Sequence, residues 1–194
     1  SSGPRDIESV SLEIKIQEFL DINCSQKLFL LHGNAGSGKS LFGRWLESYL
    51  WNLFIQGDDE CIIPIFVPLA SLKYPSRNII EESLTSHGFT QKQINKLYES
   101  SSCERYLFIL DGFDEINCKQ NLYEGNKFGE CKNIKVMITS RSEYLFSLGN
   151  YLSYFGSSSN LQEYYIRPFD IKKRSLFFEK IVKEGISVWN NPLK

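Results

Sequence analysis

The chain has 194 residues, a formal net charge of -1 and 42% hydrophobic residues, proportions that fit one soluble globular domain with a sizeable core. An aromatic content of 14% disfavours intrinsic disorder, and 22 basic against 23 acidic residues leave no positive field for nucleic acid. No apolar run approaches the roughly 20 residues that cross a bilayer, and the opening residues lack the basic-then-apolar pattern that would predict a signal peptide.

Apolar residues repeat along the chain with the periods of helices and strands. In chain order, we expect a helix at 6–20, a strand at 27–32, a helix at 41–53, a strand at 61–69, helices at 77–86 and 90–99, strands at 105–110, 135–139 and 163–166, and a helix at 170–184. Loops are expected at 117–133 and 156–160. Strands that alternate with helices predict an α/β fold with a parallel sheet of five strands.

Individual side chains refine these elements. Pro64 and Pro68 cannot donate to a ladder, so they place the strand at 61–69 at an edge of the sheet. Thr90 is a suitable cap for the helix that follows it. Trp45 and Trp51 follow helical spacing, so we expect them in the core rather than stacked on a nucleotide base.

Cysteine and histidine usage indicates the compartment. The chain has five cysteines and no Cys-x-x-Cys pair, so we expect reduced thiols in a cytoplasmic protein, Cys103 and Cys118 among them. Only two histidines are present, and neither has a nearby pair of ligands, so zinc is not expected. For His32, a buried ring satisfied by the backbone is a simpler interpretation than a catalytic role.

Residues 33–40 read Gly-Asn-Ala-Gly-Ser-Gly-Lys-Ser and match the complete phosphate-loop pattern between a buried strand and an amphipathic helix. Glycines allow backbone N–H groups to surround phosphate oxygens, Lys39 adds a full charge, and the Ser40 hydroxyl can ligate Mg²⁺. The alternative is a glycine-rich surface turn. The nucleotide-binding residues expected from this loop are Gly33, Asn34, Ala35, Gly36, Ser37, Gly38, Lys39, Ser40 and Leu41.

Carboxylates end the third predicted strand. Asp111 stands where a phosphate-loop enzyme holds Mg²⁺ together with Ser40. Asp114 or Glu115 could then act as the general base that activates water, with Glu115 the preferred candidate. The alternative is that these two acids only cap and solvate the start of a helix.

The phosphate loop and the run Asp111-Gly112-Phe113-Asp114-Glu115 together resemble the NACHT family, which belongs to the STAND class of signal-transduction NTPases. The family's hallmark is a small residue after the Mg²⁺ aspartate, followed by paired acids, and this run reproduces it. Segments 63–69, 138–141 and 167–180 resemble the family's second strand, its sensor strand and the passage into its first helical subdomain.

The resemblance implies a three-layer α/β phosphate-loop NTPase of the ASCE/STAND type, with a central parallel sheet in the order 5-1-4-3-2. It further implies a nucleotide-binding domain over 6–168 and the start of a truncated helical subdomain over 169–194, after a cloning remnant or linker over 1–5. Half of the nucleotide cleft would then be open. We therefore expect weak nucleotide binding and slow hydrolysis.

The function implied by the resemblance is Mg²⁺-dependent binding and slow hydrolysis of ATP, which switches self-association of a larger, innate-immunity-like signalling protein. ATP rather than GTP follows from the family, and Asn126-Lys127-Phe128-Gly129 does not complete a guanine-binding Asn-Lys-x-Asp motif. Arg141 ends the sensor strand, where the family uses an arginine to reach the γ-phosphate and a guanidinium can donate a forked pair of bonds. The alternative is a surface or helix-start arginine paired with Glu143.

Two other functions remain open. A nucleotide-binding interaction module without useful turnover would carry the same phosphate loop. A small-molecule kinase would also carry it, but would need an arginine-rich lid after the sensor strand. Residues 143–162 contain no arginine, which disfavours the kinase.

Overall fold

The structure is a computed structural model that describes residues 11–57, 62–98, 104–116, 120–156 and 158–167. The helix expected at 170–184, the subdomain start at 169–194, the linker at 1–5, and Cys103 and Cys118 all lie outside the described residues.

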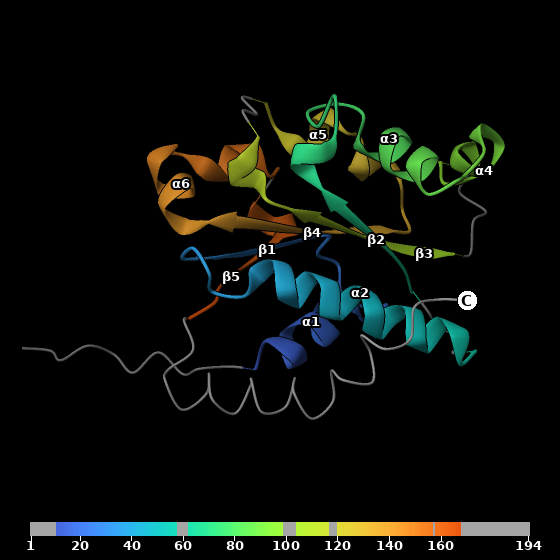
Figure 1. Ribbon diagram of the computed structural model, residues 1–194, viewed down its shortest axis with the longest axis horizontal. Coiled ribbons are helices and arrows are strands. Elements are labelled where there is room, and N and C mark those ends of the chain that lie inside the picture. The colour runs from blue at the N-terminus through green and yellow to red at the C-terminus, as the bar shows by residue number, and fades with distance from the viewer. Residues whose placement is uncertain (1–10, 58–61, 99–103, 117–119, 157, 168–194) are drawn as a thin grey trace, which may run out of the picture.

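A five-stranded sheet forms the centre of the fold (Figure 1). Its strands are β1 (Leu28–Gly33), β2 (Ile62–Pro68), β3 (Arg105–Asp111), β4 (Ile134–Arg141) and β5 (Leu161–Tyr165). All neighbouring pairs are parallel, and the order is β2-β3-β4-β1-β5. This confirms the expected order, and the edge position of β2 confirms the inference drawn from Pro64 and Pro68.

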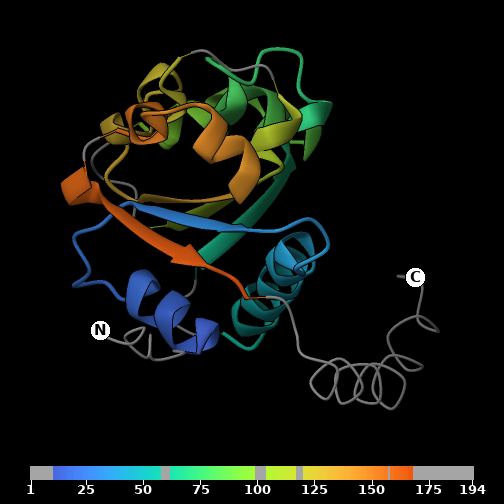
Figure 2. The same ribbon diagram turned by 90° about the vertical axis from the view of Figure 1, so that its left-hand side faces the viewer.

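Helices cover both faces of the sheet, so the expected three layers are confirmed. The helices are α1 (Leu12–Leu20), α2 (Lys39–Ile55), α3 (Ile79–Ser86), α4 (Gln91–Lys96), α5 (Leu122–Gly125) and α6 (Ser142–Ser147). Figure 2 shows α1 and α2 on one face and the other helices on the opposite face. Thr90 caps α4 with a capping box. Its side chain accepts a hydrogen bond from the Gln93 backbone N–H, and the Gln93 side chain accepts one from the Thr90 backbone N–H.

The core has one hydrophobic cluster on each face of the sheet. Along β1, Leu28 and Leu30 join the cluster under α3, whereas Phe29 and Leu31 join the one under α1 and α2. Every residue of β1 is buried, which agrees with a strand covered on both faces. In the sheet, β1 lies between β4 and β5.

The prediction that Trp45 and Trp51 belong to the core is wrong, because their side chains are 41% and 37% exposed. The buried face of α2 is instead formed by Gly43, Leu46 and Leu50. The apolar residues of α2 are distributed around nearly the whole helix. Periodicity therefore does not identify the face that packs on the sheet. A glycine adds nothing to a hydrophobic pattern, yet Gly43 packs directly against Phe66 and Ile109 of the sheet.

Short helices are present where loops were expected. Residues 117–133 include α5 and a 3₁₀ turn at Phe128–Glu130, and Leu122, Tyr123 and Phe128 are buried. The helix α6 directly follows β4 and was not predicted. Segments of four to six residues span too few turns to show a helical period in sequence.

We predict that Gly43→Val destabilises the fold. A Cβ at Gly43 would lie 3.1 Å from the Phe66 ring and 3.1 Å from Ile109 Cγ2, so the larger side chain must push α2 away from β2 and β3. Overpacking of this kind costs about 1–3 kcal/mol. Urea unfolding measures the loss, and Ser48→Val on the exposed side of α2 should stay within about 0.5 kcal/mol. Equal losses in the two variants would contradict the prediction.

Candidate nucleotide site

The phosphate loop connects the end of β1 to the start of α2. Gly36 and Gly38 have φ values of 70° and 96°, in a region that L side chains rarely adopt. Gly38 immediately precedes α2, whose 17 residues direct the positive end of the helix dipole toward the loop. Ser40 lies in the first turn of α2 and is exposed, as are Asn34, Ala35 and Leu41.

Gly33 is required for a different reason, namely the lack of space around it. A Cβ at this position would lie 2.8 Å from the carbonyl oxygen of Ile166 and 2.9 Å from the Ser37 hydroxyl. The Ile166 N–H donates to the His32 carbonyl at 2.8 Å. The chain that leaves β5 therefore packs directly on the start of the loop.

The Lys39 ammonium is folded into the loop. Its Nζ donates to the carbonyl oxygens of Gly33 at 3.0 Å and Asn34 at 2.9 Å, and the residue is only 9% exposed. Burial lowers the pKa of Lys39, the negative charge of Asp114 opposes that decrease, and the positive charge of Arg141 adds to it. The charged ends of β3 and β4 therefore act on the same ammonium that occupies the loop.

Asp111 is fixed by a threonine of the neighbouring strand. The Thr139 hydroxyl donates to Asp111 Oδ1 at 2.6 Å and accepts from the Gly112 N–H at 3.0 Å. Thr139 is buried, so these bonds are shielded from water. The sequence placed Thr139 in the sensor strand but did not assign it this role, because the bond spans 28 positions.

The donors present at Asp111 and Ser40 fit a magnesium ion. Mg²⁺ prefers hard oxygen ligands and retains several waters. The Asp111 carboxylate and the exposed Ser40 hydroxyl are oxygen donors, and Thr139 occupies only one carboxylate oxygen. No group of three or more His, Cys, Asp or Glu side chains in the described ranges could hold a metal by itself. A metal here would therefore need phosphate or water ligands as well.

Asp114 and Arg141 form a two-bond pair across the ends of β3 and β4. Asp114 Oδ1 accepts from the Arg141 backbone N–H at 3.0 Å, and Oδ2 lies 2.9 Å from Arg141 Nε. The Asp114 side chain is 10% exposed, whereas that of Arg141 is 52% exposed. The ion pair of Arg141 is thus with Asp114 and not with Glu143. Arg141 is the residue immediately before α6, and it stands opposite Gly33 in the β1–β4 register.

Glu115 is the exposed member of the acidic pair and folds back over the turn. Gly112 has a φ of 82°, and a Cβ there would lie 2.9 Å from the Glu115 carboxyl carbon. The Glu115 carboxyl group therefore lies against the turn that directly follows Asp111. This separates the two acids: Asp114 holds an arginine, and Glu115 is the carboxylate open to solvent.

The remaining titratable candidate next to the loop is His32. It is buried as expected, but its partners are side chains rather than the backbone: Ser142 at 2.9 Å and Glu163 at 3.2 Å. The free thiols of the described residues, Cys24 and Cys131, lie away from the loop, and burial raises the pKa of Cys131 to about 11.

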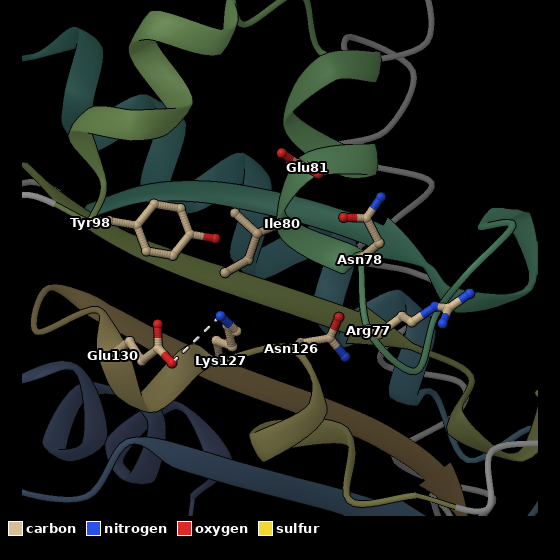
Figure 3. A pocket seen from close by; sticks show the side chains of 8 residues that line it. All are labelled: Arg77, Asn78, Ile80, Glu81, Tyr98, Asn126, Lys127 and Glu130. Carbon is tan, nitrogen blue, oxygen red and sulfur yellow. Dashed lines mark ion pairs between the residues drawn. The ribbon is translucent and has the colours of Figure 1, made fainter.

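A separate surface pocket of about 450 Å³ lies beside α3 (Figure 3). Arg77 and Lys127 line it together with Glu81 and Glu130, so its charges balance, and Lys127 lies 3.9 Å from Glu130. None of the expected site residues lines this pocket. The candidate site is therefore the phosphate-loop edge of the sheet.

Comparisons with known proteins identify the family of the chain. The sequence profile of the family described as "NACHT domain" matches residues 27–184. No curated protein sequence matches the chain. None of the helices in the described part of the chain has the length and apolarity needed to cross a membrane.

Two solved structures share the fold. The Aeropyrum pernix ORC2 protein in its ADP form has a TM-score of 0.52 at 12% identity, over 88% of this chain and 50% of that one. The Aeropyrum pernix ORC1 protein in complex with DNA has a TM-score of 0.52 at 15% identity, over 88% of this chain and 47% of that one. The chain thus spans about half the length of these proteins. At such low sequence identity, the similarity shows a shared fold and nothing more.

We predict that Thr139→Val destabilises the strand ends at the site. Valine keeps the shape of threonine but leaves the buried Gly112 N–H without an acceptor and Asp111 without its donor. An unsatisfied buried group costs about 1–3 kcal/mol. Denaturant unfolding should show this loss, whereas Thr85→Val on the exposed side of α3 should change little. A Thr139→Val variant as stable as the unchanged chain would contradict the role assigned to this hydroxyl.

Proposed function

Because the chain belongs to the NACHT domain family of nucleotide-binding phosphate-loop NTPases, we propose that it binds ATP with Mg²⁺, hydrolyses it slowly, and acts as a nucleotide switch for the oligomerisation of a larger signalling protein. One observation carries the proposal: Asp111 at the end of β3 and Arg141 at the end of β4 both act electrostatically on the ammonium of Lys39, the first residue of α2. In such sheets, this edge is where ligands bind.

Phosphate recognition would begin with an exchange of partners at Lys39. The ammonium now donates to neutral carbonyl oxygens of Gly33 and Asn34. Bonds between charged groups are roughly twice as strong as neutral ones, so phosphate oxygens would compete well for this donor. The start of α2 adds a partial positive charge at the same place. The loop therefore supports binding of the β- and γ-phosphates.

The metal would be held between Ser40 and Asp111, and when bound it would neutralise charge on the phosphates. The Thr139 hydroxyl orients the Asp111 carboxylate by occupying Oδ1, which leaves the other oxygen for the metal or its waters. Partners of this kind keep a ligating carboxylate in one orientation.

Hydrolysis would use Glu115 as the general base. Asp114 is engaged twice by Arg141 and is almost buried, so it serves as the anchor of that arginine instead. Glu115, Ser40 and more than half of the Arg141 side chain are open to solvent. Water that competes for these groups weakens transition-state stabilisation, which supports slow turnover.

The switch would depend on Arg141. Asp114 engages the backbone N–H and Nε of Arg141, so the two terminal guanidinium nitrogens can serve a γ-phosphate. ADP lacks that phosphate and would leave Arg141 with Asp114 alone. A differential contact of this kind is what a nucleotide needs to shift a conformational equilibrium. The choice of ATP over GTP and self-association rest on the family, and the cytoplasmic location rests on the cysteine usage.

We predict that Lys39→Met weakens nucleotide binding about tenfold or more, because charge-assisted bonds to phosphate are lost. Calorimetric titration of the 194-residue chain with ATP and ADP, with and without Mg²⁺, measures this. Lys92→Met on the exposed surface of α4 is the matched control and should bind as the unchanged chain does. If the unchanged chain bound neither nucleotide, or if Lys39→Met bound both normally, the proposed function would be wrong.

We also predict different effects for the two acids. Glu115→Gln should reduce the rate of ATP hydrolysis about 10²-fold and leave ATP affinity nearly unchanged, because only the proton acceptor is lost. Asp114→Asn should instead reduce the preference for ATP over ADP, because Arg141 loses an ionic anchor. Phosphate release and nucleotide titration separate the two, with Glu124→Gln as an exposed control. An unchanged hydrolysis rate in Glu115→Gln would favour the non-hydrolysing interaction module.

A further inference from the structure

A chain of hydrogen-bonded side chains connects four elements directly behind the phosphate loop. His32 Nδ1 lies 2.9 Å from the Ser142 hydroxyl, and His32 Nε2 lies 3.2 Å from Glu163 Oε1. The Tyr151 hydroxyl donates to the same Glu163 oxygen at 2.7 Å. These residues belong to β1, α6, β5 and the 3₁₀ turn at Tyr151–Tyr154, so His32 is the point at which these elements are linked.

The position of His32 connects these hydrogen-bonded side chains to the nucleotide site. Its backbone continues into Gly33, the first residue of the phosphate loop, and its ring contacts the first residue of α6. That residue, Ser142, directly follows Arg141. His32 is 6% exposed and Ser142 is 4% exposed, so the bond between them is shielded from water.

The bonding pattern is consistent with one tautomer of a neutral ring. Burial lowers the pKa of His32, Glu163 opposes the decrease, and Lys39 adds to it. The Glu163 carboxylate can only accept, so Nε2 carries the proton and Nδ1 accepts from the Ser142 hydroxyl. The bond to Glu163 raises the pKa of Tyr151 to about 12, so the phenol keeps its proton and donates. Glu163 thus sets the tautomer that binds Ser142.

We propose that His32 is a positioning residue for nucleotide recognition: it holds Ser142, and through it the start of α6, so that Arg141 is aligned with the γ-phosphate. This rests on the proposed function, in which Arg141 distinguishes ATP from ADP. Arg141 is then held from two sides. Asp114 holds its backbone N–H and Nε from the end of β3, and His32 holds the next residue from the end of β1.

A purely structural role would not need this arrangement. An apolar side chain would fill the same space between Phe146 and Tyr165. The centroids of these two rings lie 6.0 and 5.5 Å from the centroid of the His32 ring, in edge-on arrangements. A buried imidazole costs desolvation that its bonds to Ser142 and Glu163 must offset. Two polar partners on different elements instead fix where α6 begins relative to the loop.

The test uses two variants that each keep one of the two bonds. His32→Asn places a polar atom near the position of Nδ1 and can still bond Ser142. His32→Gln places a polar atom near the position of Nε2 and can bond only Glu163. His87→Asn, at the end of α3, is the control. Two quantities are measured in the 194-residue chain: amide hydrogen exchange over residues 141–147, and the ratio of the dissociation constants for ADP and ATP.

We expect His32→Gln to speed exchange in α6 and to lower the ATP preference about fivefold or more, whereas His32→Asn and His87→Asn stay within about twofold of the unchanged chain. In an Arg141→Ala background, His32→Gln should not change the ratio further, because the group that it positions is gone.

Unchanged exchange in α6 of the His32→Gln variant would overturn the inference, whether or not nucleotide binds. Equal losses of ATP and ADP affinity in that variant would also overturn it, since a general loss of structure has that effect. Failure of the unchanged chain to bind either nucleotide would overturn the proposed function and this inference together, which distinguishes it from the first two outcomes.

Discussion

The position of β1 between β4 and β5 is the constraint on which the whole site depends. Phe29 and Leu30 belong to opposite core clusters, so β1 is covered on both faces, and it is paired with β4 on one side and with β5 on the other. In a parallel sheet, its carboxyl end then lies between the carboxyl ends of its two neighbours. Gly33 stands opposite Arg141, and His32 stands beside Tyr165. The phosphate loop is thus placed by the packing of the strand that precedes it.

Much of the fold could be predicted from the sequence, because a buried parallel strand is a continuous apolar run and turn residues separate one run from the next. Their ends were placed within one or two residues, although the strand order came from the family resemblance and not from periodicity. The faces of the helices could not be predicted in the same way. Trp45 is apolar and exposed, and Gly43 is buried without a hydrophobic side chain. Close approach of a helix to a sheet depends on three-dimensional fit, which no local pattern encodes.

The residues of the site also fall into a group that local sequence predicts and a group that only the fold brings together. The loop over 33–40 and the acids after β3 are local motifs, and their residue types predict phosphate binding and metal binding. The partners that orient them are distant in sequence: Thr139 for Asp111, Arg141 for Asp114 and Ser142 for His32. The sequence favours Glu115 over the adjacent Asp114 as the base, but it cannot show that the two acids have different partners. The bond from Arg141 separates them, and only the folded chain contains it.

The charges at this edge also set a condition on the nucleotide. Asp114 and Arg141 neutralise each other, which leaves the Lys39 ammonium under the influence of the carboxylates of Asp111 and Glu143. A bare triphosphate that entered the loop would bring further negative charge close to Asp111, and like charges at short range repel strongly where water is excluded. A divalent cation between Asp111 and the phosphates would turn that repulsion into attraction. The balance of charge around Lys39 therefore supports the proposal, made above from the motif, that the nucleotide binds together with Mg²⁺.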